Sequence, residues 1–190
     1  MSTITLKKIQ KILQNKSSKK VCQSFNKFVP NSQNVYGVKV PILNDLAKAY
    51  KKSSFELVEI LWKSGAFEEQ ILAAKILKNI SKKDPDRTLN LVKKFSKKIS
   101  NWAICDTLGQ QSIKLISELK QREIFDLSKK LVKSKNFWER RFSLVILENF
   151  KKDIKSKEFI TEIMKQLEND KEYYVKKAVE WTRRDLAKLK

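Results

Sequence analysis

Apolar residues recur at helical spacing along almost the whole chain. Examples are Leu57, Ile60 and Leu61, followed by Ile71, Leu72, Ala74, Ile76 and Leu77. Side chains three and four residues apart lie on the same face of an α-helix, so this spacing predicts amphipathic helices that each bury one stripe. We count roughly ten or eleven short helices along the sequence. The pattern therefore predicts an all-α fold.

Several of the predicted helices begin after residues that favour a helix N-terminus. Ser54, Asp84 and Ser117 each stand directly before such a helix. Their side-chain oxygens can accept hydrogen bonds from the free N–H groups of a first helical turn. The clearest loop is predicted over residues 31–40. Pro41 is predicted to open the next helix, because its fixed φ suits the first turn.

Four segments of the chain superimpose as repeats. Each segment has an aromatic anchor at the same place, and the anchors are spaced by 35, 35 and 36 residues: Phe67, Trp102, Phe137 and Tyr173. Helix pairs stacked at this period form an α-solenoid, in which each repeat buries its apolar face against its neighbours and one set of helices lines a concave surface. We therefore predict that residues 1–190 form a single solenoid domain.

The slots that follow the anchors hold the candidate chemistry. Residues four positions after each anchor lie on nearly the same helix face as the anchor. In the four repeats these residues are Ile71, Asp106, Arg141 and Lys177. The residues one further turn along are Lys75, Gln110, Val145 and Trp181. On a concave face, neighbouring repeats would place Asp106 beside Arg141, with Trp102 and Trp181 close by. Such a group can stabilise positive charge next to a phosphate backbone. The alternatives are a surface ion pair of little energetic consequence and two tryptophans in the core.

The charge balance predicts a polyanionic partner. The 190-residue chain has 42 Lys and Arg against 21 Asp and Glu, a net charge of +21. No acidic residue precedes Asp45, so we expect a basic N-terminal arm or helix pair. Long-range attraction and counterion release favour nucleic acid first and an anionic membrane surface second. A codon preference for lysine is the alternative, although it would raise the glutamate count as well.

Several classes of chemistry are excluded by composition. The sequence has no histidine, which excludes an imidazole general base, a Ser-His-Asp triad and a histidine-rich metal site. Cys22 and Cys105 form no CxxC motif, which fits a reduced chain with buried thiols and no zinc site. The apolar run 142–147 is too short to span a bilayer. We expect a soluble, cytoplasmic monomer without metal or cofactor, in which Trp62 and Trp138 are packing residues.

A set of short motifs in a fixed order resembles a known family. They are Tyr36-Gly37-Val38-Lys39-Val40-Pro41, Leu61-Trp62, Trp102-x-x-x-Asp106, Trp138-x-x-Arg141 and the stretch 174–184 with Lys176-Lys177 and Trp181-Thr182-Arg183-Arg184. Over residues 25–186 the chain resembles the DNA alkylation repair glycosylases of the AlkD type. The resemblance implies a right-handed superhelix of HEAT-like repeats with duplex DNA on its concave face. It also implies hydrolysis of the N-glycosidic bond of cationic N3- and N7-alkylated purines.

The resemblance also implies roles for individual residues. Asp106 would be the catalytic carboxylate, Trp102 and Trp181 would contact the lesion-bearing nucleotide, and Arg141 would hold the adjacent backbone. Further DNA contacts would come from Phe25, Lys39, Lys177 and Arg184. Relatives carry a tyrosine where Phe25 stands, and they commonly add a helix pair after the tryptophan-arginine helix, whereas this sequence ends at Lys190.

This reaction suits a protein without histidine. A cationic purine leaves as a neutral base, so no general acid is needed, and Asp106 beside Arg141 would stay ionised to face the oxocarbenium-like sugar. One alternative is a non-catalytic HEAT-like protein that recognises bent or branched DNA through its backbone. Another is a protein-binding adaptor. If Trp102 and Trp181 are exposed, the enzyme is favoured. If they are buried, the non-catalytic protein is favoured, and an apolar groove would favour the adaptor.

Overall fold

Helices account for all the regular secondary structure in the described part of the chain. The computed structural model describes residues 2–29, 32 and 34–188. The α-helices are α1 (Ser2–Asn15), α2 (Lys19–Phe28), α3 (Val40–Ala49), α4 (Phe55–Lys63), α5 (Phe67–Ile80), α6 (Pro85–Ser96), α7 (Trp102–Gln111), α8 (Gln121–Leu131), α9 (Phe137–Val145), α10 (Lys157–Gln166) and α11 (Tyr173–Leu186). Short 3₁₀ helices are η1 (Ser81–Lys83), η2 (Ile146–Phe150) and η3 (Ile154–Ser156). The all-α prediction and the expected number of helices are confirmed within these residues.

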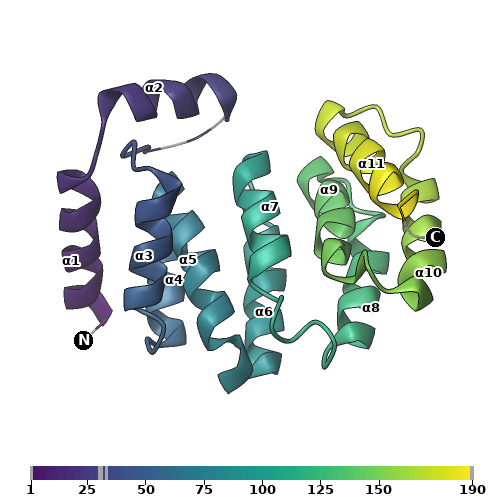
Figure 1. Ribbon diagram of the computed structural model, residues 1–190, viewed down its shortest axis with the longest axis horizontal. Coiled ribbons are helices and arrows are strands. Elements are labelled where there is room, and N and C mark those ends of the chain that lie inside the picture. Colours follow the sequence, from purple (N-terminus) through teal and green to yellow (C-terminus); the bar gives the residue numbers. More distant parts are fainter. Residues whose placement is uncertain (1, 30–31, 33, 189–190) are drawn as a thin grey trace.

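The helices stand in two rows (Figure 1). In the first, which we call the inner row, α3, α5, α7, α9 and α11 each pack against the next. In the second, α4, α6, α8 and α10 each pack against the inner helix that follows in sequence. Helices α5, α7, α9 and α11 begin at the four aromatic anchors. The predicted repeat therefore marks the start of successive inner helices.

Two of the three predicted N-terminal capping residues are confirmed. The side chains of Ser54 and Asp84 accept hydrogen bonds from backbone N–H groups three residues on, at 3.4 and 2.8 Å. The prediction for Ser117 is wrong, because α8 begins only at Gln121. The Ser117 hydroxyl donates instead to the carbonyl of Lys114 at 3.2 Å. The hydroxyl thus bonds to the preceding turn and does not cap a helix.

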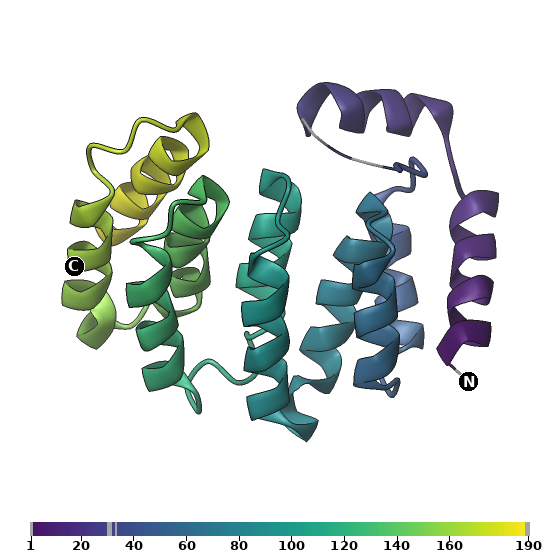
Figure 2. The same cartoon turned by 180° about the vertical axis from the view of Figure 1, so that it is seen from behind.

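The predicted loop and the N-terminal helix pair are both present. Residues 32 and 34–39 have no regular structure, whereas Asn31 lies outside the described residues. Helix α3 begins at Val40, one residue earlier than predicted, with Pro41 in its first turn. Helices α1 and α2 form the expected basic pair. Helix α2 lies across the ends of α3 and α5 and reaches toward α7 (Figures 1 and 2).

A buried carboxylate at the start of α5 fixes this loop. Glu68 is fully buried, and its Oε1 accepts the N–H groups of Gly37 at 2.7 Å and Val38 at 3.0 Å. Its Oε2 accepts the Tyr36 N–H at 3.0 Å. A buried carboxylate is tolerated only when such donors satisfy it. The Tyr36 hydroxyl donates to Glu69 at 2.6 Å, and burial together with this carboxylate raises the pKa of the phenol.

The apolar run 142–147 is buried on all sides. Helix α9 passes into η2 within this run, and η2 packs against both α7 and α8. The segment therefore lies between the two rows and serves as core. None of the described helices is long and apolar enough to cross a membrane.

Two glycines with similar backbone angles provide a test of how tightly the loop is docked. Gly37 has φ +82°, and a Cβ there would lie 2.4 Å from the Ser18 carbonyl oxygen and 2.8 Å from the Cys22 nitrogen. Gly65 has φ +75° but has no atom within 4 Å of such a Cβ. We expect Gly37→Ala to lower the free energy of unfolding by about 1–3 kcal/mol more than Gly65→Ala, because only the first adds overpacking to backbone strain. Urea unfolding measures both, and equal losses would contradict the docking.

Candidate active site

Two asparagines position the helices that carry the site. The Asn101 side chain accepts the Ile104 N–H at 3.0 Å, and the Asn136 side chain accepts the Trp138 N–H at 2.9 Å. Each asparagine stands directly before an aromatic anchor, so these caps start α7 and α9 at corresponding points of two repeats. Residues at equal distances along the two helices are thereby brought side by side.

An ion pair joins α7 to α9 at the predicted slot. Arg141 Nη2 lies 2.7 Å from Asp106 Oδ1 and 3.0 Å from Oδ2, and Arg141 Nε lies 3.3 Å from Oδ1. The Arg141 side chain is 6% exposed, whereas that of Asp106 is 21% exposed. The predicted contact is confirmed. The carboxylate is held from the protein side and keeps part of its surface for an external molecule.

The same arginine extends the connection to α11. Arg141 Nη1 donates to the Tyr174 carbonyl at 2.7 Å. All three guanidinium nitrogens thus donate to the protein, and little of the group is left for an external phosphate. In this structure Arg141 orients Asp106.

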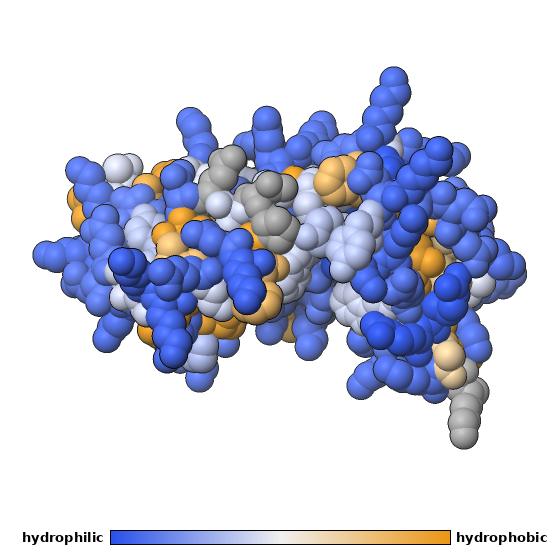
Figure 3. Space-filling model, turned by 90° about the horizontal axis from the view of Figure 1, so that it is seen from above, coloured by the Kyte–Doolittle hydropathy of each residue, from blue (hydrophilic) through white to orange (hydrophobic). Residues whose placement is uncertain are grey.

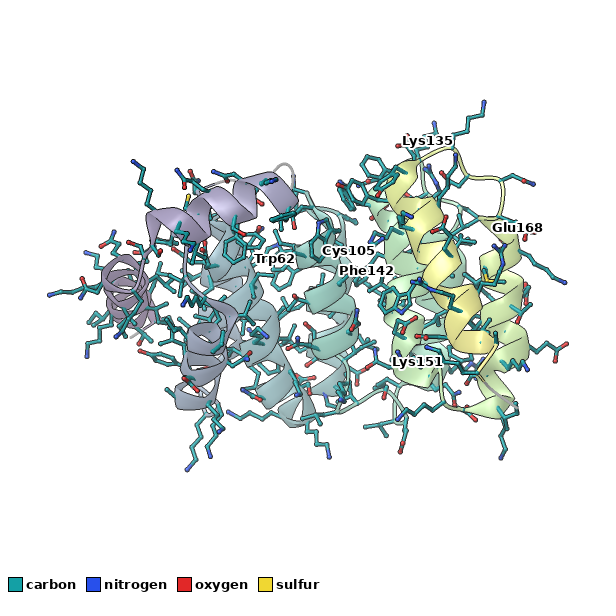
Figure 4. The ribbon with its side chains drawn as sticks, turned by 45° about the horizontal axis from the view of Figure 1, so that its top comes forward. Trp62, Cys105, Lys135, Phe142, Lys151 and Glu168 are labelled. Atoms are coloured by element: carbon teal, nitrogen blue, oxygen red, sulfur yellow. The ribbon has the colours of Figure 1, made fainter. Side chains whose placement is uncertain are left out.

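Burial governs the acidity of the carboxylate. Desolvation raises the pKa of Asp106 above its ordinary value, although the charge and hydrogen bonds of Arg141 act in the opposite direction. Burial is the larger of the two effects. The adjacent Cys105 is fully buried, and burial followed by the Asp106 charge raises its thiol pKa. Figure 4 labels Cys105 and Phe142 in the layer where α7 faces α9.

Trp102 lies one turn before Asp106 on α7 and is half-buried. Its indole Nε1 donates to the Phe28 carbonyl at 3.0 Å. Phe28 is the last residue of α2, so this bond connects the crosswise N-terminal helix to the helix that carries Asp106. The orientation of the ring thus depends on both helices.

Trp181 is also half-buried and lies on α11, two turns beyond Tyr174. The ammonium of Lys151 lies 5.7 Å from its ring centroid, within the range of a cation–π contact. Lys151 is in turn held by Glu148 at 3.0 Å and Asp185 at 2.9 Å. Lys151 is not predicted from the sequence, because it follows η2 and occupies no slot of the repeat.

The other two tryptophans are packing residues, as predicted. Trp62 and Trp138 are each 6% exposed. Trp62 stacks on Phe95 with ring centroids 4.3 Å apart, and Trp138 stacks on Tyr174 at 5.0 Å. The half-buried state of Trp102 and Trp181 therefore distinguishes them from the tryptophans of the core.

The four further candidates for DNA contact are divided among α2, the start of α3 and α11. Phe25 is partly buried against Phe67, with ring centroids 5.1 Å apart. Lys39 is exposed at the start of α3. On α11, Lys177 is exposed and paired with Glu180 at 3.0 Å, whereas the exposed Arg184 makes no ion pair with any described residue. No described contact joins these four side chains to Asp106.

The described residues show no metal cluster, and most of one face of their surface is hydrophilic. No group of three or more Cys, Asp or Glu side chains in this part of the chain could hold a metal ion. Hydrophilic side chains cover most of the face seen from above, with small separate hydrophobic patches (Figure 3). The exposed large apolar residues are scattered: Ile4, Phe28, Val40, Leu115, Leu119, Ile154 and Tyr173.

Comparison with known proteins assigns the chain to a family. The model of a family described as DNA alkylation repair enzyme matches residues 9–190. No curated protein matches the chain. The family match includes α7, α9 and α11, the helices that carry the Asp106–Arg141 pair and both half-buried tryptophans. Since this match spans nearly the whole length, the chain belongs to the DNA alkylation repair enzyme family.

Proposed function

We propose that this protein is a DNA glycosylase that hydrolyses the N-glycosidic bond of cationic N3- and N7-alkylated purines in duplex DNA. The observation that carries the proposal is the Asp106 carboxylate, which is fixed by a buried arginine yet partly exposed. It lies one turn from a half-buried tryptophan. Membership of a DNA alkylation repair enzyme family supports the substrate class.

The chemistry requires negative charge beside the sugar. When the bond from C1′ to the alkylated purine nitrogen breaks, its electron pair neutralises the cationic base, which leaves without a proton. Positive charge then develops on the deoxyribose, and Asp106 would stabilise it. Water adds to C1′ and its proton passes to the carboxylate or to solvent. The raised pKa of Asp106 makes the carboxylate a better proton acceptor than an ordinary aspartate.

The surrounding side chains would position and assist this carboxylate. Trp102 and Trp181 present aromatic surface to a cationic base or sugar, and such contacts contribute about 0.5–2 kcal/mol each. Lys151 already lies near the Trp181 ring and would hold it in place from the protein side. Arg141 acts through Asp106 and is a positioning residue in this proposal.

Duplex DNA would lie along the inner row. The net charge of +21 supplies the long-range attraction, and Lys39 and Arg184 are exposed cations at opposite ends of that row. A non-catalytic DNA-binding protein would use the same charges but would not need an ionised Asp106. The partial exposure of Trp102 and Trp181 favours the enzyme, and the scattered apolar residues disfavour an adaptor.

Replacing the Asp106 carboxylate tests the proposed catalysis. We expect Asp106→Asn to slow the release of 7-methylguanine from duplex DNA by roughly 10²–10³ and to leave DNA affinity unchanged, because the amide keeps the shape but not the charge. Asp170→Asn is the matched control, since Asp170 pairs with the neighbouring Arg140 at 2.6 Å. Single-turnover assays measure the rate. Full activity of Asp106→Asn would refute the catalytic role and favour the non-catalytic protein.

The pH profile reports the ionisation of the same group. The reaction needs the charged carboxylate, so the rate should be present above the pKa of Asp106 and lost as the pH falls through it. Burial raises this pKa above 3.8, so the acid limb should lie above the ordinary aspartate range. Arg141→Gln should move the limb to higher pH, because it removes the charge that opposes burial. A single-turnover series at graded pH, with thermal unfolding as the folding check, measures both limbs. If the acid limb of Arg141→Gln lies at the same pH as that of the unaltered protein, Arg141 does not lower the pKa of Asp106.

Salt dependence distinguishes phosphate contacts from surface charge. We expect Arg184→Ala to reduce the slope of log affinity against log salt by about 0.9, the value for one phosphate contact. Arg183→Ala is the control, because Arg183 is already paired with Glu168 at 2.7 Å. Fluorescence anisotropy on a labelled duplex gives both slopes. Equal slopes for Arg184→Ala and the unaltered protein would exclude a phosphate contact by Arg184.

A further inference from the structure

A cavity of about 740 Å³ lies between the C-terminal ends of α4 and α6. Each of these two helices packs against the inner row, and their side chains meet each other beside the cavity. Its volume falls within the range of roughly 300–1,000 Å³ found for ligand sites. Neither Asp106 nor its partners line it. Figure 4 labels Trp62, which lines the cavity, in the half of the molecule with α2 to α7, and Lys151 in the other half.

The floor of the cavity is aromatic and rigid. Trp62 and Phe95 both line it and stack on each other at 4.3 Å, with ring planes 8° apart. Ile60 adds an apolar wall. Trp62 is 6% and Phe95 2% exposed, so packing holds both rings in place and only a small part of Trp62 reaches the cavity. An apolar surface of this kind favours a planar ring as ligand.

The amide of Gln70 lines the cavity and makes no hydrogen bond with the described residues. Gln70 is 6% exposed. The indole Nε1 of Trp62, which also lines the cavity, is buried without a hydrogen-bond partner among the described residues. Leaving a buried polar group unpaired costs about 1–3 kcal/mol, so such a group marks a place where a polar ligand is expected. An amide offers donors and an acceptor together, which is the pattern that glutamine presents to the edge of a base.

The rim of the cavity is positively charged. Lys63, Lys97 and Lys98 line it, are exposed and make no ion pair with any described residue. The acid in the lining, Glu59, is already neutralised by Lys94 at 3.0 Å and by Arg87 at 3.4 Å. The interior of the cavity suits a planar ligand that forms hydrogen bonds. The cationic rim favours a ligand that also carries an anionic group.

We propose that this cavity binds an unpaired nucleotide of a DNA strand. The base would lie beside the exposed part of Trp62 with its edge on Gln70, and the phosphates would lie on the lysines. Aromatic stacking combined with a cationic track is how proteins bind single strands without strong sequence preference. A strand fits better than a free nucleotide, because the lysines come from two separate segments and can reach successive phosphates. This binding goes beyond the proposed glycosylase reaction and does not depend on Asp106.

The test compares two duplexes that differ only at one end. Fluorescence anisotropy at fixed salt measures the affinity of the protein for a blunt duplex and for the same duplex with a short single-stranded adenine overhang. We expect the overhang to strengthen binding by roughly fivefold or more. Gln70→Leu and the double variant Lys97→Glu, Lys98→Glu should each lose this gain. The control Lys130→Glu, Lys133→Glu makes the same charge change at exposed lysines outside the cavity and should keep it.

Competition and activity measurements separate the outcomes. Deoxyadenosine monophosphate should reduce the gain from the overhang, whereas inorganic phosphate at the same concentration should not. If phosphate competes equally, or if the cavity variants bind the overhang like the unaltered protein, the proposal is overturned. Thermal unfolding checks that Gln70→Leu is folded. Release of 7-methylguanine should persist in every cavity variant, because the cavity takes no part in that reaction. If the unaltered protein does not release 7-methylguanine, that result contradicts the glycosylase proposal and leaves the cavity proposal standing.

Discussion

The guanidinium of Arg141 holds three successive helices of the inner row in one arrangement. From α9 it bonds to the Asp106 carboxylate on α7 and to the Tyr174 carbonyl on α11. Breaking a buried ion pair by removing one partner leaves an uncompensated charge and is strongly destabilising. The geometry of the candidate site and the packing of the repeats that carry it therefore depend on the same group.

A second buried charge organises the N-terminal half. Glu68 binds three backbone N–H groups of the loop before α3, and the Gly37 carbonyl accepts the Ser18 N–H at 3.0 Å, next to the start of α2. Helix α2 ends at Phe28, whose carbonyl receives the Trp102 indole. A chain of polar contacts thus runs from α5 through the loop and α2 to the helix that carries Asp106. The orientation of Trp102 is set by residues far from it in sequence.

Much of the fold and part of the site follow from patterns in the sequence. The spacing of Phe67, Trp102, Phe137 and Tyr173 marks the starts of four inner helices, and the slot four residues on identifies the contact between Asp106 and Arg141. Such predictions succeed because helical periodicity and capping are local, so a repeated sequence places equivalent residues side by side. The prediction at Ser117 fails, because its hydroxyl donates back to the Lys114 carbonyl and α8 begins only at Gln121.

The sequence by itself determined the helical class, the repeat, the basic surface and the absence of histidine chemistry, because each depends on composition or on residues a few positions apart. Only the tertiary structure decided how far each side chain is buried. It made burial outweigh Arg141 in the acidity of Asp106, set Lys151 beside Trp181, and left Gln70 without a partner in a cavity between α4 and α6. These features arise where helices from different repeats meet. The distance and angle between packed helices depend on the fit of many side chains at once, which no single stretch of sequence specifies.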